Sequence, residues 1–172
     1  MEMTQTHLLR YGTIEPVRVG IHRLVLYSSI GGGRMAKRLS VIDVDRCVGC
    51  QLCMFACTRR TGQGGVGESR IGVRSAGGMR KGFVVVVCRA CAHPPCASVC
   101  PTGALTLREG GGVTFNAKLC VGCGKCQQAC PFGAVFWDES EHRPLICVYC
   151  GICAQYCPHD VIAHEDVPEG CS

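Results

Sequence analysis

The most constraining feature of this chain is a cysteine run with the spacing C-x2-C-x2-C-x3-C-P, made by Cys120, Cys123, Cys126, Cys130 and Pro131. Two-residue gaps allow three thiolates from one tight loop to converge on three corners of a cuboidal iron–sulfur cluster. The fourth thiolate points away and, where two clusters are present, binds the neighbouring one. The run therefore predicts ligands for [4Fe–4S] clusters, and the chain contains four such runs.

The other three runs keep this pattern with small changes. The first is followed by Thr58 instead of proline, and the second has a longer middle gap that contains His93-Pro94-Pro95. We expect His93 to be a plain loop histidine, with a hydrogen bond near a cluster as the alternative. Taken together, the predicted ligands are Cys47, Cys50, Cys53, Cys57, Cys88, Cys91, Cys96, Cys100, Cys120, Cys123, Cys126, Cys130, Cys147, Cys150, Cys153 and Cys157.

Two other uses of cysteine compete with this interpretation. Seventeen cysteines in a short secreted chain would indicate a disulfide scaffold, but here the number is odd and sixteen fall into four sets of four. Zinc is the alternative metal because paired C-x2-C also occurs in zinc ribbons, and the third cysteine of every run favours clusters instead. Cys171 lies outside every run and is expected to be a surface thiol.

Hydropathy and charge narrow the class of protein further. The longest apolar run, Phe83 to Cys88, is far shorter than the roughly 20 residues of a membrane-spanning helix, and no export signal is recognisable, so we expect a cytoplasmic protein without membrane contact. The formal net charge is +5. Four oxidised clusters with their thiolates add about −8, which makes the Lys/Arg excess a compensation for cluster charge. Since no aromatic residues interleave with the basic ones, no nucleic-acid partner is expected.

Short elements are predicted around the cysteine runs, in a repeat of cysteine loop, short helix across the x3 gap, turn and strand. The glycine-rich stretch 59–82 is predicted as loop, and its arginines as a solvated face, with partner docking or tuning of cluster potential as the alternative. Trp137 is expected to pack as core over a hairpin. The expected strands are Leu39–Val44, Arg70–Arg74, Phe83–Val87, the hairpins 105–107 with 113–115 and 135–137 with 145–146, and a strand after the fourth run.

Residues 1–40 differ from the rest because they hold no cysteine. The alternation of Val17, Val19 and Ile21 indicates one or two short strands, and Gly31–Gly33 reads as a flexible joint. We expect an N-terminal arm that bridges to a neighbouring subunit, another copy of the chain included; a disordered tail is the alternative.

Spacing alone leaves the pairing of the runs open, since the third run is well spaced to pair with either the second or the fourth. Further residues carry a resemblance: Cys47-Val48-Gly49-Cys50-Gln51-Leu52-Cys53, Cys88-x2-Cys91-Ala92-His93-Pro94-Pro95-Cys96, and Cys100-Pro101-Thr102-Gly103-Ala104-Leu105. With them, the stretch from about Ser40 to Ile162 resembles the four-cluster iron–sulfur subunits of molybdenum- and tungsten-pterin oxidoreductases. Examples are dimethyl sulfoxide reductase, formate dehydrogenase and some aldehyde oxidoreductases, with related hydrogenase ferredoxins.

The resemblance implies an α+β fold of two ferredoxin-like modules with short hairpins and cysteine loops, one nested in the other. The outer module would comprise 41–82 and 140–172, and the inner module 83–139. The first run would pair with the fourth and the second with the third. The implied ligand sets are Cys47, Cys50, Cys53 with Cys157; Cys147, Cys150, Cys153 with Cys57; Cys88, Cys91, Cys96 with Cys130; and Cys120, Cys123, Cys126 with Cys100.

The function implied is a non-catalytic relay of single electrons through four [4Fe–4S] clusters. No Ser-His-Asp order, GxGxxG motif or P-loop is present, so substrate chemistry is expected on another chain. The expected partners are a pterin–metal oxidoreductase and a flavin subunit or soluble ferredoxin. Of the pterin–metal enzymes, the tungsten aldehyde oxidoreductase type is preferred. Membrane-linked relatives usually continue well past the fourth run, so a soluble complex is expected. The alternatives are a hydrogenase or formate dehydrogenase subunit, a free polyferredoxin, and a zinc or redox-sensing module.

Overall fold

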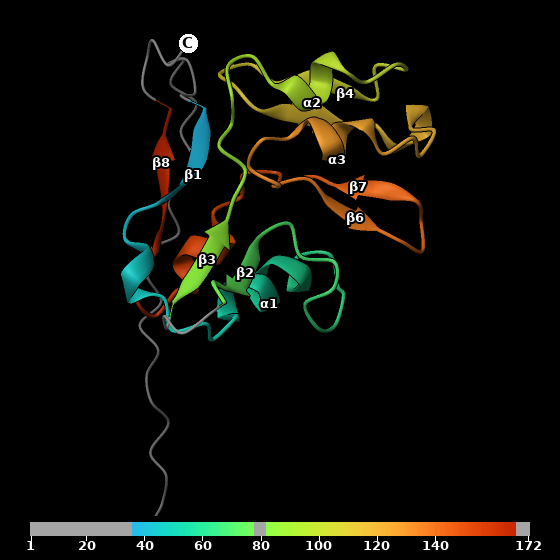
Figure 1. The fold of residues 1–172 in the computed structure, drawn as a ribbon. Coiled ribbons are helices and arrows are strands. Elements are labelled where there is room, and N and C mark those ends of the chain that lie inside the picture. The colour runs from blue at the N-terminus through green and yellow to red at the C-terminus, as the bar shows by residue number, and fades with distance from the viewer. Residues whose placement is uncertain (1–35, 78–81, 168–172) are drawn as a thin grey trace, which may run out of the picture. The chain divides into compact units, whose positions relative to one another are not determined.

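The computed structural model describes residues 36–77 and 82–167. The predicted N-terminal arm, apart from its last five residues, and Cys171 lie outside this part of the chain. The described residues form a small α+β fold in which every strand pairs with one other strand, antiparallel (Figure 1). The four pairs are β1 (Lys37–Val41) with β8 (Ile162–Asp166), β2 (Gly72–Ser75) with β3 (Phe83–Val86), β4 (Leu105–Leu107) with β5 (Val113–Phe115), and β6 (Phe136–Asp138) with β7 (Arg143–Leu145).

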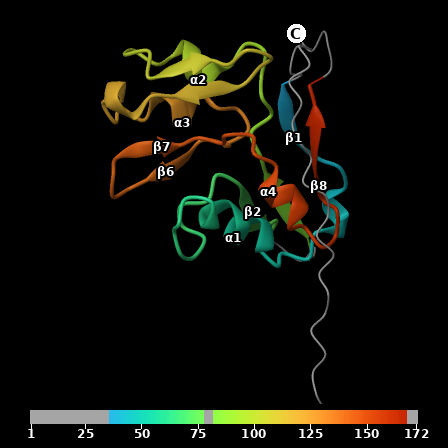
Figure 2. The same cartoon turned by 180° about the vertical axis from the view of Figure 1, so that it is seen from behind.

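The pairing of β1 with β8 brings the first and fourth cysteine runs together. The two strands lie side by side in opposite views (Figure 1; Figure 2), with Leu39 opposite His164. Leu39 is only 2% exposed, because its side chain packs into a hydrophobic core. The chain then passes through the 3-10 helix η1 (Val44–Arg46) into the first run.

The strand predicted over Leu39–Val44 therefore ends earlier than expected, at Val41. Asp43 is the reason: its side chain accepts a hydrogen bond from the backbone N–H of Asp45, 3.0 Å away, and so caps η1. An aspartate that satisfies a free N–H in this way favours a helical turn over continued strand.

A short helix follows the middle of each run, as predicted. The residue before three of these helices has a left-handed backbone: Gln51 (φ 59°), Gly124 (φ 71°) and Gly151 (φ 75°). The left-handed residue turns the loop sharply into the helix, so the third cysteine faces the same side as the first two. The helices are α1 (Leu52–Arg59), α2 (Pro95–Ser98), α3 (Lys125–Ala129) and α4 (Ile152–Gln155), with a second 3-10 helix, η2 (Ala117–Leu119), before the third run.

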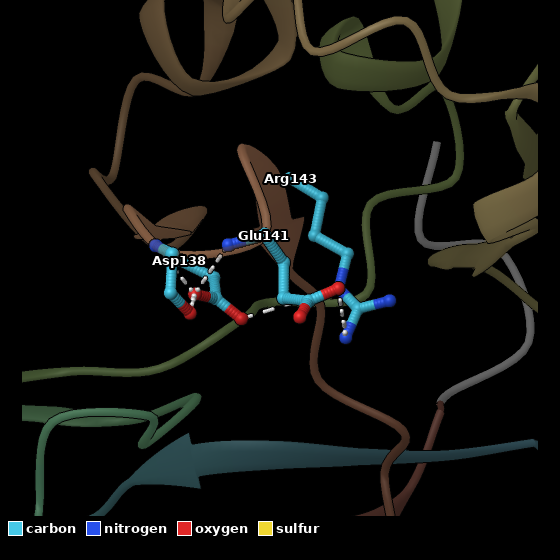
Figure 3. A network of polar contacts seen from close by, with 4 residues as sticks. Asp138, Glu141 and Arg143 are labelled. Atoms are coloured by element: carbon cyan, nitrogen blue, oxygen red, sulfur yellow. Dashed lines mark hydrogen bonds and ion pairs between the residues drawn. The ribbon is translucent and has the colours of Figure 1, made fainter.

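Both predicted hairpins are present. The first has the expected bounds. In the second, β6 lies one residue further along the chain than expected, and β7 begins two residues and ends one residue earlier, because Val135 and Ile146 are buried in the core instead of lying in the ladder. Its turn is closed by polar contacts (Figure 3): the Asp138 carboxylate accepts hydrogen bonds from the Ser140 hydroxyl (2.7 Å) and the Glu141 N–H (3.1 Å). Arg143 lies 3.5 Å from Glu141 and 4.0 Å from Asp138.

Two hydrophobic cores are present in the described residues. The first core takes residues from both ends of the described chain, and the second takes them from its middle. The strand β3, expected to open the inner module, pairs with β2, and its Phe83 packs against the first core. Trp137 packs half-buried against the second core, as predicted. The first core comprises Leu39, Cys53, Ile71, Val73, Val87, Ala90, Cys147, Tyr149, Cys153, Val161 and Ile162, and the second Cys96, Leu105, Val113, Cys126, Val135 and Ile146.

Within residues 36–77 and 82–167, none of the helices has both the length and the apolar character required to cross a membrane.

Candidate metal centres

In the described part of the chain, four cavities are lined by cysteines, and each has its own set of four; Cys147 of one set also lines a second cavity. In every set, three cysteines come from one run and the last comes from the end of another run. We name each set after the middle cysteine of its three. The Cys50 set is Cys47, Cys50, Cys53 and Cys157; the Cys150 set is Cys147, Cys150, Cys153 and Cys57; the Cys91 set is Cys88, Cys91, Cys96 and Cys130; the Cys123 set is Cys120, Cys123, Cys126 and Cys100.

A single ion and a cluster need different arrangements of thiols. One zinc ion needs its sulfurs about 2.3 Å from a common point. Among the residues that the structure describes, no three His, Cys, Asp or Glu side chains converge in that way. A cuboidal cluster instead places iron at its corners, so thiols spaced around a cavity fit it. The residues present therefore fit [4Fe–4S] clusters, while the individual sulfur–iron bonds stay a prediction.

The third cysteine of each run is buried, and in the fourth run the first cysteine, Cys147, is buried too. Cys53, Cys96, Cys126 and Cys153 lie on the first turns of the four helices and are 5–9% exposed. Burial, with the neighbouring thiols adding to it, raises the pKa of Cys53 and of Cys96 to about 11, and the pKa of Cys153 to about 12. Such thiols keep their protons at neutral pH unless a metal compensates the thiolate charge, so cluster binding must release protons.

The last cysteine of a run receives backbone N–H groups from the turn that follows it. Ala134 donates to Cys130 Sγ (3.4 Å) and Val161 donates to Cys157 Sγ (3.3 Å), each from four residues further along. At Cys100, burial raises the pKa of the thiol, but hydrogen bonds from the Leu105, Thr102 and Ala104 backbones and the Thr102 hydroxyl outweigh it and lower the pKa. These turns therefore stabilise a thiolate.

Cys57 is the exception, because Thr58 replaces the proline that starts the turn in the other runs. The helix α1 continues to Arg59, and the buried Thr58 hydroxyl contacts the carbonyls of Phe55 and Gly65. The N–H that reaches Cys57 Sγ comes from Arg70, at 3.4 Å. The loop after the first run therefore replaces the missing turn. Arg60 and Arg70 also line the Cys150-set cavity, so two arginines of the expected solvated face lie beside predicted ligands.

His93 is exposed and does not line the Cys91-set cavity, whereas Pro94 and Pro95 do. Sequence reasoning missed two other residues near that set. The Tyr149 hydroxyl lies 3.2 Å from Cys88 Sγ, and the Arg108 guanidinium lies 3.9 Å from the centre of the Tyr149 ring. A signal was available: the first and third runs read Cys-Val-Gly-Cys, and the fourth has tyrosine in the place of that glycine.

A family model described as "4Fe-4S dicluster domain" matches residues 79–166, which is more than half of the chain. This chain therefore belongs to that family. A 4Fe-4S dicluster protein binds more than one [4Fe–4S] cluster, and the matched residues hold the second, third and fourth cysteine runs.

Relatives of this dicluster protein are named as components of reductases. It is 41% identical over 97 residues to a subunit of the tetrathionate reductase of Archaeoglobus fulgidus, covering 56% of this chain and 46% of the relative. It is 34% identical over 113 residues to a component of the anaerobic dimethyl sulfoxide reductase of Escherichia coli, covering 58% and 55%. The chain thus spans about half the length of these relatives. Among solved structures, the active site complex BamBC of benzoyl coenzyme A reductase matches with a TM-score of 0.42 and 18% identity, over 79% of this chain and 81% of that one.

Proposed function

We propose that this chain is a non-catalytic electron-transfer subunit that binds four [4Fe–4S] clusters, one in each cysteine set. The observation that carries the proposal is the composition of the four sets, each with three thiols from one run and a fourth from another around one cavity. The clusters supply one-electron transfer when bound. The chain supplies the thiolates, the N–H groups that point at them, and the apolar surroundings that limit water.

The positions of the sets along the helices indicate an order. On α1, Cys53 belongs to the Cys50 set and Cys57 to the Cys150 set. The run around α4 also contributes to both sets, Cys153 to the Cys150 set and Cys157 to the Cys50 set. The Cys50 and Cys150 sets are therefore neighbours. By the same reasoning α2 and α3 join the Cys91 and Cys123 sets, since each of their runs contributes to both.

One residue connects the pair of Cys50 and Cys150 sets with the pair of Cys91 and Cys123 sets. Cys147, a member of the Cys150 set, also lines the Cys91-set cavity. We therefore order the sets as Cys50, Cys150, Cys91 and Cys123, with the two ferredoxin-like modules meeting between the second and third. The same grouping supports the proposal of an inner module held within an outer one.

The two end sets reach the surface. Cys50 and Cys123 are the exposed members of the sixteen cysteines in the described residues. Each lies beside exposed apolar side chains, Val48 near Cys50 and Val121 near Cys123, which are 56% and 66% exposed. Electrons would enter and leave at these two places, because a partner must approach an end set closely.

The partner at one end would be the catalytic subunit of a pterin–metal oxidoreductase, and at the other a flavin subunit or a soluble ferredoxin. The names of the relatives favour a reductase of the dimethyl sulfoxide or tetrathionate type. The proposal of a tungsten aldehyde oxidoreductase as the partner rests only on the family resemblance of the sequence. A hydrogenase or a formate dehydrogenase is the alternative partner. Native co-purification with identification of the partners by mass separates these proposals, and recovery of the chain alone would favour a free polyferredoxin.

The cluster proposal is tested on the chain prepared without oxygen. We expect about sixteen irons per chain and a broad absorption near ~400 nm that is lost on reduction. Zinc in place of iron, or an iron content that stays far below that figure after reconstitution, would overturn the proposal.

A further inference from the structure

We infer that Tyr149 raises the reduction potential of the cluster held by the Cys91 set, by donating a hydrogen bond to the sulfur of Cys88. The inference rests on the proposed function, because it requires a cluster in that set. Tyr149 is a positioning residue, because its hydroxyl contacts the sulfur of a predicted ligand, Cys88.

The hydrogen-bond geometry fixes the direction of the Tyr149 proton. The Tyr149 Oη lies 3.2 Å from Cys88 Sγ and also 3.2 Å from the backbone nitrogen of Val113. The Val113 N–H must donate to the phenol oxygen, so the phenol hydrogen is available for the sulfur. A thiolate bound to iron has no proton, which makes Tyr149 the donor of the Tyr149–Cys88 pair.

The ring is held in place from several sides. Tyr149 is only 5% exposed, and the Arg108 guanidinium lies over its ring at 3.9 Å. Arg108 is itself anchored by 2.8 Å hydrogen bonds to the carbonyls of Gly111 and Lys37. A side chain at Gly112 would overlap the Tyr149 hydroxyl, so the glycine keeps the space that the phenol needs.

Tyr149 has a left-handed backbone at a place that is filled by glycine in the first and third runs and by the small Ala90, with φ of 52°, in the second. Gly49 and Gly122 occupy the same place in the first and third runs, with φ of 71° and 68°. Tyr149 has φ of 55°, in the left-handed region that is uncommon for residues other than glycine and a genuine outlier for bulky ones. Retention of a bulky residue in such a conformation points to a use for its side chain.

The position of Tyr149 explains that use. Its main chain lies between Cys147 and Cys150, two members of the Cys150 set, while its hydroxyl reaches Cys88 of the Cys91 set. A hydrogen bond to a ligand sulfur stabilises the additional negative charge of the reduced state more than the oxidised state. Tyr149 therefore favours the reduced state of the cluster held by the Cys91 set, where the two pairs of sets meet.

The test is Tyr149→Phe in the iron-loaded protein, with a redox titration followed by electron paramagnetic resonance. We expect one component to be harder to reduce, by about tenfold in the reduced-to-oxidised ratio, or about 59 mV for one electron. Cys91→Ser, which alters the same set, identifies that component. The matched control is Tyr156→Phe, because Tyr156 also lies in the fourth run but is 60% exposed and shows no side-chain hydrogen bond to the described residues.

A second replacement separates the hydroxyl from the packing. 4-Fluorophenylalanine at position 149 fills the space of the phenol without a donor, and the same component is expected to shift in the same direction. If both replacements load iron fully and leave every potential unchanged, the inference is overturned while the proposed function stands. If the unaltered chain holds no clusters, the proposed function fails first.

Discussion

At the residue scale, the four cysteine loops depend on backbone conformations that most residues avoid. Gly122 has φ of 68°, and a side chain there would come within 2.7 Å of the His142 carbonyl oxygen. The glycine thus lets the loop turn closely enough for its thiols to face one cavity. The spacing of the thiols is a local feature, which explains why the sequence could predict all sixteen as ligands.

Removal of one ligand tests this scale directly. Cys123 is exposed, so Cys123→Ala removes little buried area, and any loss of stability reports the loss of a ligand. We expect about four irons fewer per chain and a lower thermal unfolding midpoint, since folding of a metal-dependent module is coupled to ligation. The measurements are iron analysis and a thermal melt without oxygen.

Cys171→Ala is the matched control, because that cysteine lies outside every run and should leave the iron content unchanged. A Cys123→Ala protein with full iron and normal thermal stability would contradict the assignment.

At the element scale, the β1–β8 ladder joins the two ends of the described chain, and its apolar contact matters more than its ion pairs. Leu39→Ala is expected to lower the free energy of unfolding by about 2–5 kcal/mol, because it leaves a cavity in the first core. Lys37→Ala removes the 2.8 Å ion pair with Asp166, whose side chains are 47% and 49% exposed, and should cost about 0–1 kcal/mol. Denaturant unfolding of the two iron-loaded variants measures both, and equal losses would contradict this ranking.

The stability of the β6–β7 turn is expected to depend on pH. The Ser140 hydroxyl and the Glu141 N–H, with a smaller contribution from Arg143, lower the pKa of Asp138 below its ordinary value of 3.8. These contacts favour the ionised carboxylate in the fold, so their stabilisation is complete above that ordinary value and is lost as the pH falls through the lowered pKa. Amide hydrogen exchange at Ser140 and Glu141 should therefore reveal a looser turn only in acid.

Asp138→Asn should loosen this turn already at neutral pH, where the acceptor charge is needed. Glu139→Gln, a neighbouring change on an exposed residue, is the control and should have no effect. Identical exchange in Asp138→Asn and the unaltered chain would show that the carboxylate does not hold the turn.

At the scale of the whole molecule, the proposed order of the sets places a partner surface at each end. Val121→Glu puts a charge on the apolar surface beside Cys123 and should slow electron exchange with that partner about tenfold, because the charge must be desolvated on docking. Leu107→Glu is the control: Leu107 is 57% exposed and does not line a cysteine cavity. Stopped-flow reduction of the iron-loaded variants by the co-purified partner measures both rates. Equal rates would place the docking surface elsewhere.

Much of the fold was predictable because its signals lie close together in the chain. The β4–β5 hairpin was indicated by two short alternating runs on either side of a glycine-rich turn, and it has the expected bounds. The Asp43 cap that shortens β1 was local too, but it was outweighed in the sequence by the alternating run around it. The partner of β3 was not predictable, since several strands compete for an edge and only packing against the first core selects β2.

By itself, the sequence determined that sixteen thiols are grouped for [4Fe–4S] clusters, because ligand spacing acts within a dozen residues. Spacing alone left open which last cysteine faces which loop, because that depends on contacts between distant segments. Only the tertiary structure placed the Tyr149 hydroxyl against Cys88, 61 positions away in the chain. The physical reason is the same in both cases: contacts between distant segments depend on how two cores pack, and no local pattern encodes that packing.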